Sequence, residues 1–155
     1  MKYLMRLGRG SVRDTKSRIY KGMGMEYSFV IKGEFFGNNT FPGLNDYLAE
    51  MGRHPIKGNK MKQDFMTIAS NAIRTQIPRV EIDKPVYIKY AYFEPTTKRD
   101  PSNISAFAIK VIEDALQRCD VLKNDGWKNI AGYSQEFHID KENPRIEVTI
   151  TEKEN

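Results

Sequence analysis

The sequence has little cysteine and no long apolar run, and both absences narrow what the protein can be. Cys119 is the only cysteine in the 155 residues, so no disulfide can form within the chain. A lone thiol fits a reducing compartment, and we expect the protein to be cytoplasmic. No apolar stretch approaches the ~20 residues that a membrane-spanning helix needs, and the N-terminus has no apolar signal core. We therefore expect no membrane partner.

Motifs for nucleotide cofactors and for nucleophilic catalysis are missing too. The sequence contains no P-loop, no GxGxxG and no nucleophile elbow, so we expect no small-molecule cofactor. His54 and His138 lack the spacing of metal ligands, and we interpret both as structural or surface residues. Cys119 has no neighbouring base and is expected in the core. Trp127 is expected to pack in the core or in its loop, with base stacking as the weaker alternative.

Positive charge is in excess, and it is unevenly distributed. The net charge is +5, which is typical of a protein with an anionic partner. Residues 1–24 hold seven Lys and Arg and one acid, whereas residues 25–155 have a net charge of −1. Within that second part, residues 53–99 have a net charge of +6. A charged run is most often a solvated face, so nucleic-acid binding is one of two open interpretations.

The first 24 residues differ from the rest of the chain. They are rich in Arg, Lys, Gly and Ser without sustained periodicity, which predicts an extended or disordered arm. Two explanations of this arm are open. It contacts nucleic acid through its charge, or it is a translated leader and Met25 is the true start. Residues 25–155 have the length of one domain with its own core.

The hydrophobic pattern of residues 25–155 predicts an α+β fold, a small mixed β-sheet with packed helices. Apolar residues at helical spacing predict helices over residues 44–51, 61–77 and 104–117. Alternating patterns predict strands over residues 26–33, 86–93, 131–139 and 146–150. Pro78 is expected to end the second helix, and a hairpin loop near Asn143-Pro144 is expected to join the last two strands.

Two carboxylates flank the last predicted helix. Asp100 stands just before it, and Asp125 lies in an Asn-Asp-Gly turn after it. If the chain after the helix doubles back along the sheet to the helix N-terminus, the two could hold Mg²⁺, which usually takes one or two protein carboxylates plus phosphate oxygens. The alternative is that Asp100 caps the helix and Asp125 only forms the turn.

Lys110 lies on the polar face of the same helix, in one sector with Asn103 and Asp114. A cation there can hold a phosphate or stabilise charge in a transition state. The alternative is a surface pair between Lys110 and Asp114 at i,i+4, worth a few tenths of a kcal/mol. Phosphate contacts without sequence specificity need only exposed cations, which Lys98, Arg99 and the basic stretch 53–62 can supply.

Together these segments resemble the core of the RusA family of Holliday junction resolvases. The matching runs are Lys98-Arg99-Asp100-Pro101-Ser102-Asn103, Lys110-Val111-Ile112-Glu113-Asp114-Ala115-Leu116 and Val121-Leu122-Lys123-Asn124-Asp125-Gly126-Trp127. A weaker match is Pro42-Gly43-Leu44-Asn45-Asp46-Tyr47. The resemblance covers Tyr27 to about Thr151 and excludes the arm.

The resemblance implies a RusA-like homodimer that binds four-way DNA junctions and cuts them with Mg²⁺ or Mn²⁺. Such proteins are common in phages and prophages. It implies Asp100 and Asp125 as metal-site acids and Lys110 as the essential basic residue, with Asn103 and Asp114 as further candidate ligands. DNA contacts are then expected from Lys98, Arg99, Asn45, Lys57, Lys60 and Lys62. A two-fold dimer suits a substrate with two equivalent strands to cut.

Two departures from the family pattern bear on activity. Ser102 stands where the family has a second acid, and a hydroxyl is a poorer metal ligand than a carboxylate. The helix is also about one turn longer before Lys110 than in the shortest family members, an insertion that keeps Lys110 on the same face. A non-catalytic or weakly active branched-DNA binding protein is therefore the alternative function. A third hypothesis is an interaction protein whose acids are only caps and turns.

Overall fold

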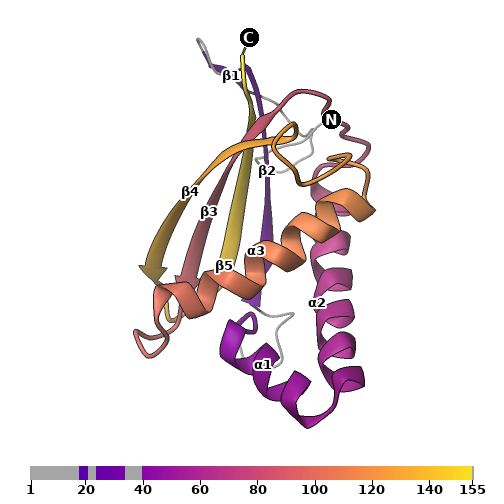
Figure 1. Cartoon of the computed structure of the whole chain (residues 1–155). Coiled ribbons are helices and arrows are strands. Elements are labelled where there is room, and N and C mark those ends of the chain that lie inside the picture. Colours follow the sequence, from indigo (N-terminus) through magenta and orange to yellow (C-terminus); the bar gives the residue numbers. More distant parts are fainter. Residues whose placement is uncertain (1–17, 21–23, 34–39, 155) are drawn as a thin grey trace.

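The computed structural model describes residues 18–20, 24–33 and 40–154 (Figure 1). Most of the expected arm therefore lies outside the described residues, but part of it forms a strand. The elements in chain order are β1 (Arg18–Tyr20), β2 (Gly24–Lys32), α1 (Leu44–Arg53), α2 (Pro55–Gln76), β3 (Val86–Glu94), α3 (Pro101–Arg118), β4 (Ile130–Ile139) and β5 (Arg145–Glu152). The three expected helices and four expected strands of the domain are all present.

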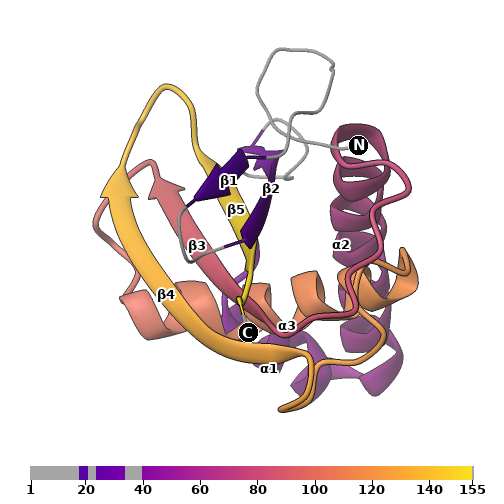
Figure 2. The same cartoon turned by 90° about the horizontal axis from the view of Figure 1, so that it is seen from above.

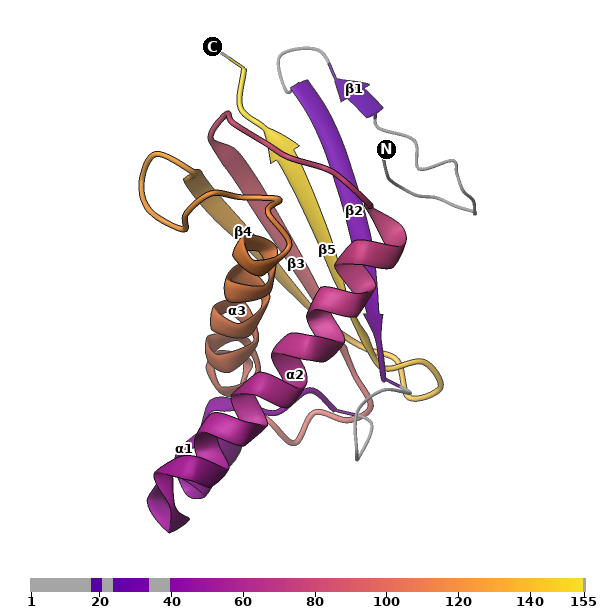
Figure 3. The same cartoon turned by 90° about the vertical axis from the view of Figure 1, so that its right-hand side faces the viewer.

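One mixed sheet forms the centre of the fold, and the helices pack against it (Figures 1 and 3). The strand order is β1-β2-β5-β3-β4, with β3 and β4 parallel and the other neighbours antiparallel. All three helices lie on one face of this sheet, as the side view shows (Figure 3). The α+β prediction is thereby confirmed.

The expected hairpin between the last two strands is wrong, because β3 lies between β4 and β5. The helix α3 carries the chain from β3 to β4, and β4 pairs in parallel on the outer edge of β3 (Figure 2). The loop after β4 then crosses to the other side of β3. Burial explains the order: Ile146, Val148 and Ile150 of β5 are at most 3% exposed, whereas most β4 side chains are exposed.

Helix α2 begins earlier than the predicted residue 61 because its first turn is well capped. Pro55 occupies the first helical position, where its missing N–H costs no hydrogen bond. The ring Nδ1 of His54 accepts the Ile56 backbone N–H at 3.1 Å. The basic stretch 53–62 therefore spans the end of α1 and the first turns of α2, and His54 has a structural role as the N-cap residue between them. The helix ends at Gln76, before Pro78, as predicted.

Helix α3 is the element that positions the polar residues of interest. Its apolar stripe is buried against the sheet and α2, and Val111, Ile112, Ala115 and Leu116 are all 0% exposed. Because a helix turns about 100° per residue, this burial directs Lys110 and Asp114 away from the core. Cys119, at the end of α3, packs against the core and is half-buried.

Candidate active site

Lys110 is the centre of a charged cluster midway along α3. Its Nζ lies 3.6 Å from Oδ1 of Asp114 and 3.8 Å from Oδ2 of Asp125. Lys62 of α2 adds a second cation, with its Nζ 3.0 Å from Oδ2 of Asp114. The i,i+4 pair expected on the helix surface is present, but tertiary contacts enlarge it to two lysines and two aspartates from three segments.

The loop after α3 brings Asp125 back to the helix. The backbone N–H groups of Val121 and Leu122 both donate to the Leu116 carbonyl, at 2.9 and 3.3 Å. Both side chains are 1% exposed, so their burial anchors the loop against the end of the helix. The Asn124 side chain then accepts the Asp125 N–H at 2.7 Å. The chain therefore doubles back along α3 as far as Lys110, and not to the N-terminal end of the helix where Asp100 lies.

Glu113 is a buried carboxyl group behind this cluster. It is 5% exposed, and the Tyr90 hydroxyl donates to its Oε2 at 3.4 Å. Burial raises its pKa, and the nearby charge of Asp125 adds to that rise. Hydrogen bonds from Tyr133 and Tyr90 oppose the shift without cancelling it. The site therefore holds one carboxyl group that keeps its proton more readily than an exposed glutamate does.

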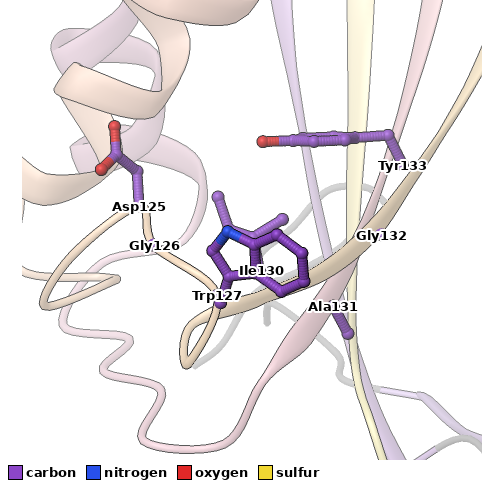
Figure 4. A pocket seen from close by; sticks show the side chains of 7 residues that line it. All are labelled: Asp125, Gly126, Trp127, Ile130, Ala131, Gly132 and Tyr133. Atoms are coloured by element: carbon purple, nitrogen blue, oxygen red, sulfur yellow. The ribbon is translucent and has the colours of Figure 1, made fainter.

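Beside Asp125 the surface forms an open hollow of about 320 Å³ (Figure 4). Its lining is Asp125, Gly126, Trp127, Ile130, Ala131, Gly132 and Tyr133. Trp127 is 99% exposed, so the expectation that it packs in the core is wrong. The reason is the local turn, in which the Gly126 carbonyl accepts the N–H groups of Asn129 and Ile130 and the chain between them projects outward.

Asp100 does not join this cluster. It is the N-cap residue of α3, and Lys110 lies ten residues further along. At 1.5 Å per residue this is about 15 Å, and the contact of Lys110 with Asp114 keeps the lysine in its own part of the helix. The extra turn noted in the sequence keeps Lys110 on its face but adds about 6 Å of length. The structure thus separates the two acids expected to share a metal.

Arg99 and Asn103 also have partners other than those expected. The guanidinium of Arg99 donates to both carboxylate oxygens of Glu94 at 3.0 Å and lies 3.5 Å from Asp46. The Asn103 side-chain oxygen accepts the backbone N–H of Asn45 at 2.8 Å. These contacts attach the start of α1 to the start of α3. The sequence predicted DNA contact for Arg99 and metal binding for Asn103, and these protein partners were not expected.

The remaining candidate DNA contacts lie on two surfaces. Lys57, Lys60 and Lys62 are on the first turns of α2, where Lys60 pairs with Asp64 at 2.8 Å. Lys98 lies in the loop before α3 and is exposed. Within the described residues, neither Lys57 nor Lys98 has an ion-pair partner, so both are available to an anion.

Comparison with models of known protein families finds no match to this chain, and comparison with curated proteins finds none either. In the described part of the chain, no three His, Cys, Asp or Glu side chains form a group that could hold a metal ion. Over the same residues, no helix is both long and apolar enough to cross a membrane. The functional argument therefore depends on the geometry of the charged cluster.

Proposed function

We propose that this protein is a metal-dependent, structure-selective DNA endonuclease of the RusA type that resolves four-way junctions. One observation carries the proposal: the loop after α3 returns Asp125 to within ion-pair distance of Lys110, beside Asp114. These three residues belong to the segments that carry the family resemblance. Only the tertiary fold brings these three side chains together, and residues that act on the same phosphate must lie close to one another.

The donor set of this cluster suits a hard divalent cation. Asp114 and Asp125 both supply carboxylate oxygens within 3.8 Å of the Lys110 Nζ, and their side chains are 21% and 32% exposed. Mg²⁺ commonly takes one or two protein carboxylates and completes its shell with water and phosphate oxygens. Bound there, the metal would activate water and stabilise charge on the phosphodiester. Asp114 and Asp125 are the residues that would hold it.

The two lysines have distinct roles in this proposal. The Lys110 side chain is 59% exposed, so its ammonium can reach a phosphate oxygen and stabilise charge that develops there. The Lys62 side chain is 27% exposed and contacts Asp114, so it orients that carboxylate. Lys60 and Lys57, which precede Lys62 on the first turns of α2, add further positive charge that a DNA backbone can contact.

The edge strand β4 supports the proposal of a homodimer. Tyr133, Phe137 and Ile139 of β4 are 49%, 39% and 55% exposed. An edge strand with exposed apolar side chains is a template for pairing with another chain. Two β4 strands related by a two-fold axis would present two Lys110 clusters to two DNA strands. We expect sedimentation to give a dimer and Phe137→Lys to give a monomer, and a monomeric wild type would contradict this.

Junction cleavage tests the proposed activity. Purified protein is incubated with a synthetic four-way junction and Mg²⁺, with a linear duplex of the same sequence and with chelator as controls. We expect symmetric cuts in the junction alone, and a loss of about 100-fold or more in Asp125→Asn. Asp64→Asn, which changes an exposed acid on α2, is the matched variant and should cut like the wild type. Equal cleavage by Asp125→Asn would refute the proposal.

A second candidate function is junction binding without cleavage. It is favoured by Ser102 and by the lack of a three-acid group in the described residues. It predicts salt-sensitive binding to junctions in preference to duplex, with no cuts in any divalent metal. Under this hypothesis Ser102→Asp, which restores the family acid, should introduce cleavage. Cleavage by the wild type would exclude it.

A further inference from the structure

Trp127 is the most exposed large hydrophobic side chain in the described part of the protein. It is 99% exposed, in a loop whose neighbours Val121 and Leu122 are 1% exposed. An isolated exposed apolar residue is ordinary, but this one stands at the rim of a hollow beside the charged cluster. The exposed indole face could therefore bind a ligand with an apolar, planar surface.

The hollow has the shape and the groups to hold a flat ring. Figure 4 shows the Trp127 indole and the Tyr133 ring on different sides of it, with the Tyr133 hydroxyl directed toward the side where Asp125 lies. Gly126 adds no side chain to the lining, and a Cβ built there would meet open space. At about 320 Å³ the hollow falls at the lower end of the range for small-ligand sites.

The chemistry of the lining matches a nucleobase. Aromatic side chains stack on the bases of single strands, which all present a π-face. The Asp125 carboxylate, 32% exposed, can accept a hydrogen bond from an amino or ring N–H of a base. Lys123 and Lys128 are exposed on either side of Trp127, and among the described residues Lys128 has no ion-pair partner. These cations can contact the phosphates that flank a bound base.

We propose that the hollow between Trp127 and Tyr133 binds one unpaired nucleobase of a DNA strand by stacking. The inference rests on the proposed function, since it takes DNA as the substrate, and it adds the feature that is recognised. A base paired within a duplex has both faces stacked already, whereas a base at a branch point is accessible. Stacking here would place the neighbouring phosphate beside Lys110 and Asp125 and so couple branch recognition to the charged cluster.

Fluorescence tests the stacking directly, because Trp127 is the only tryptophan in the chain. The wild-type protein, with chelator to prevent cutting, is titrated with a short single-stranded adenine oligonucleotide. An abasic oligonucleotide of equal length and free deoxyadenosine monophosphate serve as the other two arms. We expect saturable quenching by the adenine strand and little change with the other two. Equal quenching by the abasic strand would show phosphate contact alone and overturn the proposal, and equal quenching by the mononucleotide would overturn the placement of a strand.

Three variants, measured by anisotropy with labelled single-stranded DNA, separate stacking from simple packing. Trp127→Ala should weaken binding about tenfold or more, whereas Trp127→Phe, which keeps an aromatic face, should retain most of the affinity. Tyr87→Ala removes another exposed aromatic side chain, on β3, and should have no effect. Unchanged binding by Trp127→Ala would overturn the proposal. So would a loss of dimer in sedimentation without a change in DNA affinity, because Trp127 would then be a contact between chains.

The outcomes also separate this inference from the proposed endonuclease activity. If the wild type cuts junctions and Trp127→Ala binds single strands normally, the stacking site fails and the proposed function stands. If adenine strands quench Trp127 but junctions are neither preferred nor cut, the base site stands and the proposed function fails.

Discussion

At the N-terminal end of α3 the polar side chains are bonded to neighbouring elements, whereas midway along the helix they face a loop and solvent. Arg99, just before the helix, has a side chain 19% exposed, and its partner Glu94 is 10% exposed. Lys110 is 59% exposed. The motif residues therefore form two groups. Those near Arg99 hold the fold together, and those near Lys110 are exposed enough to bind a ligand.

The difference follows from what each group contacts. Near the helix start, Arg99 donates to Glu94 of β3, and Asn103 accepts the backbone N–H of Asn45 in α1. In the middle, Lys110 shares the Asp114 carboxylate with Lys62 and pairs alone with Asp125, and none of these contacts is shorter than 3.0 Å. Loose, partly exposed ion pairs are weak, so a metal or a phosphate can replace them.

The largest effect on stability is expected from breaking the Arg99–Glu94 pair at the N-terminal end of α3. Arg99→Ala leaves the buried Glu94 carboxylate without its bidentate partner, and the loss of one member of a buried pair costs about 3–5 kcal/mol. Urea unfolding followed by circular dichroism measures this. Lys60→Ala, which breaks the exposed pair with Asp64, should cost less than about 1 kcal/mol. Equal losses in the two variants would mean that Arg99 is not the structural residue its burial indicates.

The next effect sharpens the comparison between the two aspartates. Asp125→Asn should lower junction cleavage by about 100-fold, whereas Asp100→Asn, about 15 Å along α3, should lower it by about tenfold at most. Initial rates on the same junction, with unfolding curves for both variants, measure the contrast. If Asp100→Asn is as inactive as Asp125→Asn and equally well folded, the start and the middle of α3 act as one site on DNA, as the family resemblance implies.

A smaller effect is expected where α3 holds α1. Asn103→Ala removes the acceptor of the Asn45 N–H near the start of α1 and should cost about 1 kcal/mol of unfolding free energy. Thr75→Ala, which removes an exposed hydroxyl that bonds to its own helix, is the control and should cost less. An increase in junction affinity in Asn103→Ala, rather than a loss of stability, would contradict a structural role.

The smallest effect is a pH dependence at Glu113. Burial raises the pKa of Glu113 in the folded state, so folded protein binds this proton more tightly than unfolded protein. The wild type therefore loses stability as the pH rises through the folded pKa, and Glu113→Gln does not. We therefore expect Glu113→Gln to gain stability relative to the wild type between about pH 4 and about pH 8, measured as an increase in the difference between their free energies of unfolding. The exposed Glu81→Gln should show little such trend, and a flat difference for Glu113→Gln would contradict its burial.

Much of the fold could be predicted from local pattern, whereas the strand order could not. The apolar stripe of α3 and the position of Pro78 follow from spacing of a few residues, and both predictions are confirmed. The positions of β4 and β5 depend on which strand is buried inside the sheet. The hairpin prediction was wrong because it assumed that strands consecutive in the sequence are neighbours in the sheet.

The candidate site was predicted in part. Lys110 and Asp114 were expected to meet, and they do. The burial of Glu113 against Tyr90 could not be predicted from the sequence, because a charged residue next to an apolar stripe usually faces solvent. Trp127 lies two residues after Asp125 in the sequence, whereas the place of Tyr133 beside them gave no signal, since the loop and β4 form one hollow only in the folded protein.

By itself the sequence determined which faces of its helices are apolar and which residues lie four apart on α3, because the helical period is set by local backbone geometry. Only the tertiary structure decided that Asp125 joins Lys110, that Arg99 is held by Glu94, and that Trp127 stands in solvent. These outcomes depend on where distant segments come to rest when the core is buried, which no local spacing specifies.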